Sequence, residues 1–211
     1  MKKMFLCSSF KDSYALLSDF AGESLKGKRV TFFPTASAVE EVTHYVEAAK
    51  EAFQQLGMHL ETVQIDEQSA EEITQMIKQN DVIYVSGGNT FYLLQELRKH
   101  RLDDVLKEEI NNGKLYIGES AGSIIMAPNI EYISLMDDQK KAPELSSFQG
   151  FNEISRYPVP HMHNAYLGEA AQLIMEKHQQ TLNLCPLTDE QALLVTGEQA
   201  EVKSESVLTV R

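Results

Sequence analysis

A serine flanked by glycines stands between two hydrophobic stretches of the chain. Residues 118–123 read GESAGS, after the apolar run KLYI and before IIMA. Gly118, Ser120 and Gly122 match G-x-S-x-G, which at a strand-to-helix junction is typical of a nucleophilic serine on a sharp turn. Free N–H groups at the start of the following helix favour negative charge there. We interpret Ser120 as a nucleophile; an ordinary turn with a serine cap is the alternative.

A serine hydroxyl needs a neighbouring base to become a good nucleophile. In the segment PVPHMHNAY, His161 and His163 follow a short apolar run and precede a predicted helix. Two histidines two positions apart on an extended segment share a face, so a metal site is an alternative. The sequence shows no obvious acidic or cysteine ligands beside them, and zinc sites usually have three or four protein ligands. We therefore expect a base here, with no metal and no cofactor.

A second glycine-containing loop, SGGNT at residues 86–90, follows the predicted strand DVIYV. Gly88 has no side chain to block its amide, so it is a candidate donor to an oxyanion, together with the amide of Ala121. In the alternative interpretation the glycines form a turn and Asn89 caps the next helix. Both interpretations are compatible.

The elements that would position these loops alternate between strand and helix. RVTFFP, DVIYVS and KLYIG are dense in β-branched and aromatic residues, and TFYLLQELRKH has helical spacing. The capping-box pairs Ser37 with Glu40 and Ser69 with Glu72 predict two helix starts. Strands separated by helices predict right-handed crossovers and a mostly parallel sheet. We expect one α/β domain over residues 1–211, a three-layer sandwich with ligands at the carboxyl ends of its strands.

Two later segments depart from this alternation. Residues 131–155 are polar and irregular, and we interpret the excursion around 137–148 within them as a segment that closes over a small substrate. Residues 190–210, EQALLVTGEQAEVKSESVLTV, predict short antiparallel strands joined at Gly197, a small annex to the main sheet.

The composition limits the partners and the location. A net charge of −12 argues against a nucleic-acid partner, which requires clustered Lys and Arg. Cys7 and Cys185 are too few for a disulfide framework and indicate a reducing compartment. No stretch approaches the ~20 apolar residues of a membrane-spanning helix, and the apolar run at the start is too short for a signal peptide. We expect a cytoplasmic protein with no membrane partner; the sequence predicts no oligomeric state.

Four motifs, in this order and spacing, resemble the dipeptidase E family of serine peptidases, which includes aspartyl dipeptidases and the related cyanophycinases. They are FFPTAS at 32–37, SGGNTFYLL at 86–94, GESAG at 118–122 and PHMHNA at 160–165. The resemblance implies a flavodoxin-like fold similar to class I glutamine amidotransferases, with serine in place of their nucleophilic cysteine.

The resemblance also implies roles for individual residues. Ser120 matches the family's nucleophile and His161 its base, whereas His163 falls on a variable position. Gly88 and Ala121 match the positions whose amides form the oxyanion hole.

The acid of the triad is not fixed by the motifs. The family's acid aligns with the segment LMDD, which predicts Asp137 or Asp138, with Glu131 as a further candidate. Its function would be to orient the imidazole and stabilise its cation.

The segment after the histidine departs from the aspartyl dipeptidases, which carry an arginine there for the acidic side chain of the substrate. Here it reads LGEAAQLIMEKH, without arginine, and Glu119 adjoins Ser120. We therefore do not expect strict Asp-X specificity, and predict a preference for neutral or basic short peptides or amides. The predicted activity is hydrolysis of such bonds through an acyl-enzyme at Ser120; the alternatives are a non-catalytic binding or regulatory protein on the same scaffold, or an esterase.

Overall fold

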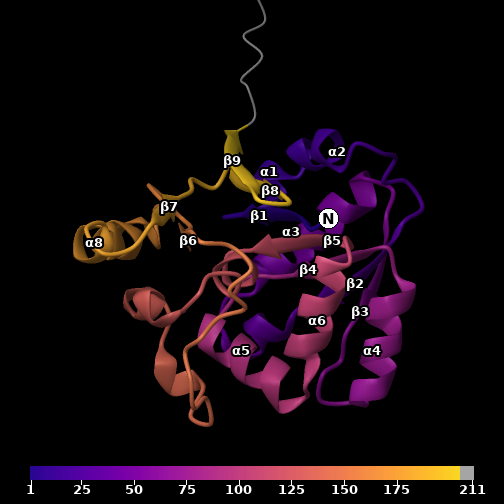
Figure 1. The fold of residues 1–211 in the computed structure, drawn as a ribbon, viewed down its shortest axis with the longest axis horizontal. Helices are drawn as coiled ribbons and strands as arrows, with labels where there is room; N and C mark the ends of the chain where they lie inside the picture. Colours follow the sequence, from indigo (N-terminus) through magenta and orange to yellow (C-terminus); the bar gives the residue numbers. More distant parts are fainter. Residues whose placement is uncertain (205–211) are drawn as a thin grey trace, which may run out of the picture.

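A seven-stranded sheet organises the chain in a computed structural model that describes residues 1–204 (Figure 1). The strand order is β3-β2-β4-β5-β1-β8-β9. The strands are β1 (Lys3–Cys7), β2 (Arg29–Phe33), β3 (His59–Thr62), β4 (Val82–Val85), β5 (Leu115–Glu119), β8 (Gln191–Thr196) and β9 (Gln199–Ser204).

The first five strands in this order are parallel, and β8 and β9 are antiparallel to their neighbours. The predicted α/β fold, with a mostly parallel sheet and a small antiparallel annex, is confirmed. The predicted annex extends to residue 210, and its part beyond residue 204 lies outside the described residues.

Helices cover both faces of this sheet because side chains alternate along each strand. On one face, α1 (Phe10–Ser13), α2 (Ala15–Ala21) and α3 (His44–Gln55) pack on the inward residues of β1, β2 and β4. On the other face lie α4 (Ala70–Gln79), α5 (Thr90–Lys99), α6 (Leu102–Asn111) and α7 (Ala121–Ile124). The strands in the middle of the sheet are therefore apolar on both sides, as parallel strands usually are.

The helix starts show where the capping signals were informative. The capping box of Ser69 and Glu72 is present at the start of α4. The prediction for Ser37 and Glu40 is wrong: Thr35–Val39 form a 3-10 turn, η1, and α3 begins only at His44. The Ser37 hydroxyl donates back to the Pro34 carbonyl at 2.7 Å, which closes a tight turn instead of capping a helix.

The irregular segment 131–155 contains two 3-10 turns, η2 (Glu131–Leu135) and η3 (Gln139–Lys141). After it come β6 (Tyr157–Val159), α8 (Gly168–His178) and β7 (Leu184–Pro186); β6 and β7 pair in parallel as a separate two-stranded sheet beside the main one (Figure 1).

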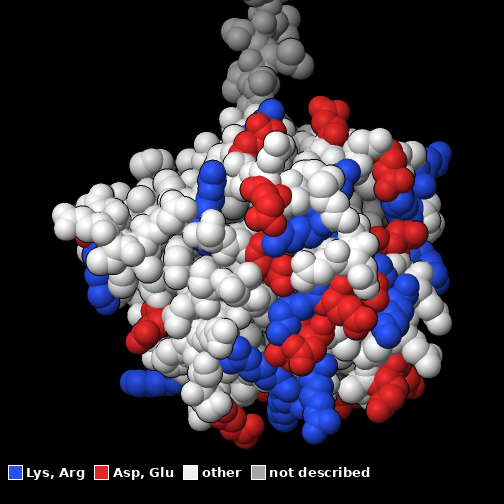
Figure 2. All heavy atoms as spheres, viewed as in Figure 1, with Lys and Arg blue, Asp and Glu red and all other residues white. Residues whose placement is uncertain are grey.

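Charged side chains of both signs mingle over the face that carries α4 and α6, whereas the surface around α8 is mostly uncharged in this view (Figure 2). Among the described residues, this face shows no continuous basic surface. No helix within residues 1–204 is long and apolar enough to cross a membrane.

Candidate active site

Ser120 lies on a sharp turn between β5 and α7. Its backbone has φ 46° and ψ −103°, a conformation that L-residues rarely adopt, so the turn is strained. The strand β5 and the helix α7 come so close that a Cβ on Gly118 would lie 2.5 Å from the Gly122 carbonyl oxygen. α7 has only four residues, so its contribution to the field at Ser120 comes from its free amides more than from a long helix dipole.

The pairing of β1 with β5 places Ser8 beside Ser120. The two strands are parallel neighbours, and Cys7 is in register with Glu119. The Ser120 amide donates to the Cys7 carbonyl at 2.9 Å, which ties the turn to the end of β1. The carboxyl edge of the sheet therefore carries two adjacent serines.

His161 reaches Ser120 from the segment after β6. Its Nε2 lies 2.9 Å from the Ser120 hydroxyl, so the predicted pair is in hydrogen-bond contact. The backbone of His161 is in the left-handed region, with φ 65°, and its N–H donates to the Ser8 hydroxyl at 2.8 Å. This contact holds a conformation that histidine adopts only at a cost.

The carboxylate that contacts the imidazole belongs to Asp189. Its Oδ1 lies 3.0 Å from His161 Nδ1, and the two side chains are 22% and 14% exposed. Parallel pairing of β6 with β7 brings the two loops together, and Leu187 N–H donates to the Val159 carbonyl at the end of that pairing. With the proton on Nδ1, the ring donates to Asp189 and accepts from Ser120.

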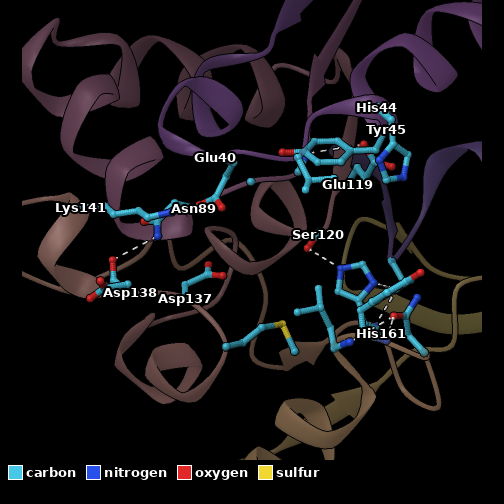
Figure 3. Close-up of a pocket in the computed structure, with 18 residues that line it drawn as sticks. Glu40, His44, Tyr45, Asn89, Glu119, Ser120, Asp137, Asp138, Lys141 and His161 are labelled. Carbon is cyan, nitrogen blue, oxygen red and sulfur yellow. Dashed lines mark hydrogen bonds and ion pairs between the residues drawn. The ribbon is translucent and has the colours of Figure 1, made fainter.

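The expectation that Asp137 or Asp138 fills this position is wrong. Asp137 Oδ2 accepts from the Thr90 amide at 2.8 Å, at the start of α5. Asp138 accepts from Lys140 N–H within η3. Glu131, the further candidate, is exposed at the start of η2. Figure 3 shows Asp137 and Asp138 across the cavity from His161, with Ser120 between them.

Two side chains fix the Asp189 carboxylate besides His161. Ser8 Oγ donates to Oδ1 at 2.8 Å, and Asn164 Nδ2 donates to Oδ2 at 2.6 Å. Burial raises the pKa of Asp189, but the hydrogen bonds from His161, Asn164 and Ser8 outweigh this effect and hold the pKa at about 2. Asp189 is therefore an anion throughout the neutral range.

The SGGNT loop lies next to the Ser120 turn. Gly88 has φ +131°, and its amide has no acceptor among residues 1–204. Asn89 does cap α5, since its Oδ1 accepts from Tyr92 N–H at 3.0 Å. The amide of Ala121, at the first position of α7, directly follows Ser120. These two amides are the ones that the sequence pattern singled out as oxyanion donors.

The Glu119 carboxylate forms hydrogen bonds to this loop and to its neighbours. Its carboxylate accepts from Tyr84 Oη at 2.6 Å, from Phe10 N–H at 2.8 Å and from Gly87 N–H at 3.4 Å. Burial raises its pKa despite these hydrogen bonds. The Glu119 side chain is thus occupied with the protein itself, and is a weaker source of repulsion for a substrate than its position beside Ser120 suggested.

A cavity of about 760 Å³ opens over Ser120. This volume is in the range of small-molecule sites and suits a short peptide better than a folded chain. Glu40, Asp137, Asp138 and Lys141 line one side, and Lys141 Nζ is paired with Glu40 at 3.0 Å (Figure 3). Burial raises the pKa of Asp137 to about 6, although the Thr90 amide donates to it.

The contacts of the histidine pair favour a base over a metal ligand. Both ring nitrogens of His161 face Ser120 and Asp189, and His163 is exposed. Within residues 1–204, the cluster with spacing suitable for an ion is Asp66, Glu96 and His100 at the end of α5, which shares no residue with this cavity.

Among the site residues that sequence reasoning missed are Asp189, Ser8, Asn164 and His44. His44, at the start of α3, lines the cavity. Ser8 had a usable signal, because it directly follows the strand run KKMFLC and therefore ends at the same edge as Ser120. Asn164 lies inside the PHMHNA motif.

Comparisons with known proteins identify the family of this chain and several of its relatives. The family model described as peptidase family S51 matches residues 4–203. An uncharacterized peptidase of Listeria monocytogenes is 45% identical over 203 residues, 96% of this chain and 98% of the relative. A peptidase E of Actinobacillus pleuropneumoniae is 30% identical over 217 positions, covering 96% and 89%.

Solved structures show the same fold. A crystal structure of a Listeria monocytogenes protein, provisionally described as a peptidase E, superposes with a TM-score of 0.92 at 46% identity, covering 98% of this chain and 100% of the other. A peptidase from an acI-B1 actinobacterium gives a TM-score of 0.70 at 19% identity, covering 98% and 88%, a likeness of fold alone.

Proposed function

The chain belongs to peptidase family S51, and from that premise we propose that it is a serine peptidase acting on short peptides through an acyl-enzyme at Ser120. The observation that supports this most is the continuous line of contacts from Ser120 Oγ to His161 Nε2 at 2.9 Å, and from His161 Nδ1 to Asp189 at 3.0 Å. Nucleophile, base and acid are in the arrangement that activates a serine hydroxyl.

Acylation begins when His161 takes the Ser120 proton and Oγ attacks the carbonyl carbon of the substrate. The imidazolium that forms is stabilised by Asp189, which remains ionised because its pKa is about 2. His161 then gives the proton to the leaving amine as the carbon–nitrogen bond breaks. The same imidazole then deprotonates water, which attacks the acyl carbon. The imidazolium returns that proton to Ser120 Oγ as the carbon–oxygen bond breaks and the acid is released.

The negative charge on the carbonyl oxygen during both steps requires hydrogen-bond donors. We assign this role to the amides of Gly88 and Ala121, on the two loops that meet at Ser120. Glu119 contributes indirectly, because its carboxylate accepts from Gly87 N–H and so fixes the loop that carries Gly88. Loss of one such donor typically costs about 3 kcal/mol of transition-state stabilisation.

The charges of the cavity favour neutral or basic peptides over peptides with an acidic residue. Asp137, Asp138 and Glu40 line it, and the Lys141 ammonium is already paired with Glu40. α8 carries no arginine that could form a bidentate pair with a substrate carboxylate. The same wall attracts an ammonium group more strongly once Asp137 is ionised, above about pH 6.

An esterase of the α/β-hydrolase type is a poorer fit. In that class the triad follows the chain order serine, acid, histidine. Here the order is Ser120, His161, Asp189, with the acid last.

The test is covalent labelling followed by a substrate panel. A fluorophosphonate probe is expected to modify Ser120 in the native chain, and Ser120→Ala is expected to abolish the modification. Ser123→Ala is the matched control, because Ser123 is also buried but donates to the Cys7 and Gly118 carbonyls. The rate enhancement over the uncatalysed reaction should be larger for dipeptides than for acyl esters of similar size. An unlabelled Ser120 in folded protein would overturn the proposal.

A further inference from the structure

Two exposed apolar side chains line the cavity on the segment that follows His161 in the chain. Tyr166 is 93% exposed and Leu167 is 36% exposed, and both line the cavity that contains Ser120. Resting on the function proposed above, we propose that they form the leaving-group subsite. It takes an aromatic or aliphatic side chain on the residue that follows the scissile bond.

The turn that presents this pair is tied to the proposed triad. Asn164 Oδ1 accepts from the amides of Tyr166 and Leu167, at 2.8 and 3.1 Å, while its Nδ2 donates to Asp189 at 2.6 Å. One side chain therefore joins the acid to the backbone of both apolar residues. The pair is held in a fixed position relative to His161, which is what a specificity subsite requires.

The turn is also fixed at both ends. Its start is held by Met162 N–H, which donates to the Leu187 carbonyl, and its end by Gly168 N–H, which donates to the Asn164 carbonyl, both at 3.0 Å. A large ring that is almost fully exposed on such a well-bonded turn contributes nothing to the core. Its apolar surface is available to a ligand in the cavity.

The chemistry of the proposed reaction decides which half of the substrate meets this pair. His161 Nε2 must hand its proton to the leaving amine, so the leaving half passes over the imidazole. Tyr166 and Leu167 belong to the turn that begins at His161. The acyl half then lies on the other side of Ser120, where Figure 3 shows Asp137, Asp138 and Glu40.

The same arrangement predicts the kind of side chain that is accepted. An apolar side chain on the leaving residue would remove the Tyr166 ring and Leu167 from water, which is favourable in proportion to the apolar area covered. Glycine offers no such area, and a charged side chain would lose hydration without gaining a partner. We therefore expect Xaa-Phe and Xaa-Leu to be better substrates than Xaa-Gly and Xaa-Asp.

The experiment compares dipeptides that share the first residue and differ in the second. With Ala-Phe, Ala-Leu, Ala-Gly and Ala-Asp, the native protein should show kcat/KM about tenfold higher for Ala-Phe than for Ala-Gly, the range given by modest apolar contacts. Tyr166→Ala should reduce that ratio about tenfold, whereas Tyr166→Phe should preserve it because the ring carries the contact. Leu173→Ala, an exposed leucine on α8 outside the cavity, is the matched control and should preserve the ratio.

Three outcomes would overturn the inference. The first is an unchanged ratio in folded Tyr166→Ala. The second is an equal loss for all four dipeptides in Tyr166→Ala together with a lower sedimentation coefficient than that of the native protein, which would make the pair a contact between copies of the chain. In the third, fluorophosphonate labels Ser120 but the native protein hydrolyses the four dipeptides without selectivity; the proposed function then survives while the subsite fails. An unlabelled Ser120 in folded protein would instead overturn both the proposed function and the subsite.

Discussion

The hydroxyl of Ser8 lies 2.8 Å from Oδ1 of Asp189, so the residue that follows β1 is bonded to the loop that precedes β8. The same hydroxyl accepts the N–H of His161 at 2.8 Å. One buried side chain thus connects the acid with the backbone of the base, although the three residues come from distant parts of the sequence. Ser8 is a positioning residue, since it acts through His161 and Asp189.

Ser8→Ala should lower kcat about tenfold while KM changes little. The His161 N–H and the Asp189 carboxylate each lose the Ser8 hydroxyl as a hydrogen-bond partner. Leaving a buried polar group without its partner typically costs roughly 1–3 kcal/mol. Steady-state kinetics on a dipeptide measures this. Ser13→Ala is the control, a serine of equal burial that donates to the Ser9 carbonyl away from His161. If both variants lose only thermal stability and retain kcat, Ser8 is merely structural.

Asp189→Asn should reduce kcat by about 10³- to 10⁴-fold, the loss typical when the group that orients a catalytic histidine becomes neutral. Asp137→Asn should reduce it far less, since Asp137 contacts the Thr90 amide and not the imidazole. The rate of fluorophosphonate labelling at Ser120 gives a second readout that needs no peptide substrate. The opposite ranking of the two variants would refute the assignment of the acid.

Much of this arrangement follows from the sequence because it depends on local patterns. The β-branched runs and helical spacing predicted parallel strands, and parallel strands end at one edge of a sheet. Ser120 and the SGGNT loop were therefore expected as neighbours. The segment with His161 and His163 was expected to supply the base, and the resemblance selected His161. The contact of 2.9 Å between Ser120 and His161 agrees with that expectation.

Asp189 could not be predicted from local sequence patterns, for a physical reason. It lies in a loop after β7, and its approach to His161 depends on the pairing of two three-residue strands, β6 and β7. Strands this short carry almost no periodic signal. The error at Ser37 is of another kind, since its hydroxyl has a competing acceptor in the Pro34 carbonyl, three residues earlier.

Gly88→Ala should lower kcat by about 10²- to 10³-fold if its amide supplies half of the oxyanion hole. A Cβ at this position would lie 2.2 Å from the Ala36 carbonyl oxygen, and φ +131° disfavours any L-side chain, so the loop must move. Gly27→Ala is the control: φ is +81°, but no atom lies within 4 Å of the added Cβ. Its effect should be confined to the melting temperature. Wild-type kcat in folded Gly88→Ala would exclude the amide from the reaction.

Asp137 should make the stability of the chain depend on pH between its unfolded and folded pKa values. The pKa is raised from 3.8 to about 6 by burial, so the folded chain holds this proton more tightly than the unfolded chain does. The contribution is complete below pH 3.8 and is lost as the pH rises through 6.

Asp137→Asn removes this dependence, because the amide oxygen can accept from Thr90 N–H without carrying a charge. Relative to the native chain, the variant should therefore gain up to about 3 kcal/mol in the free energy of unfolding between pH 4 and pH 7. Urea unfolding of both proteins across that range measures the difference. Asp138→Asn, at the exposed neighbouring position, is the matched control for the loss of one carboxylate. Parallel curves for the native chain and Asp137→Asn would show that the carboxyl ionises without hindrance in the cavity.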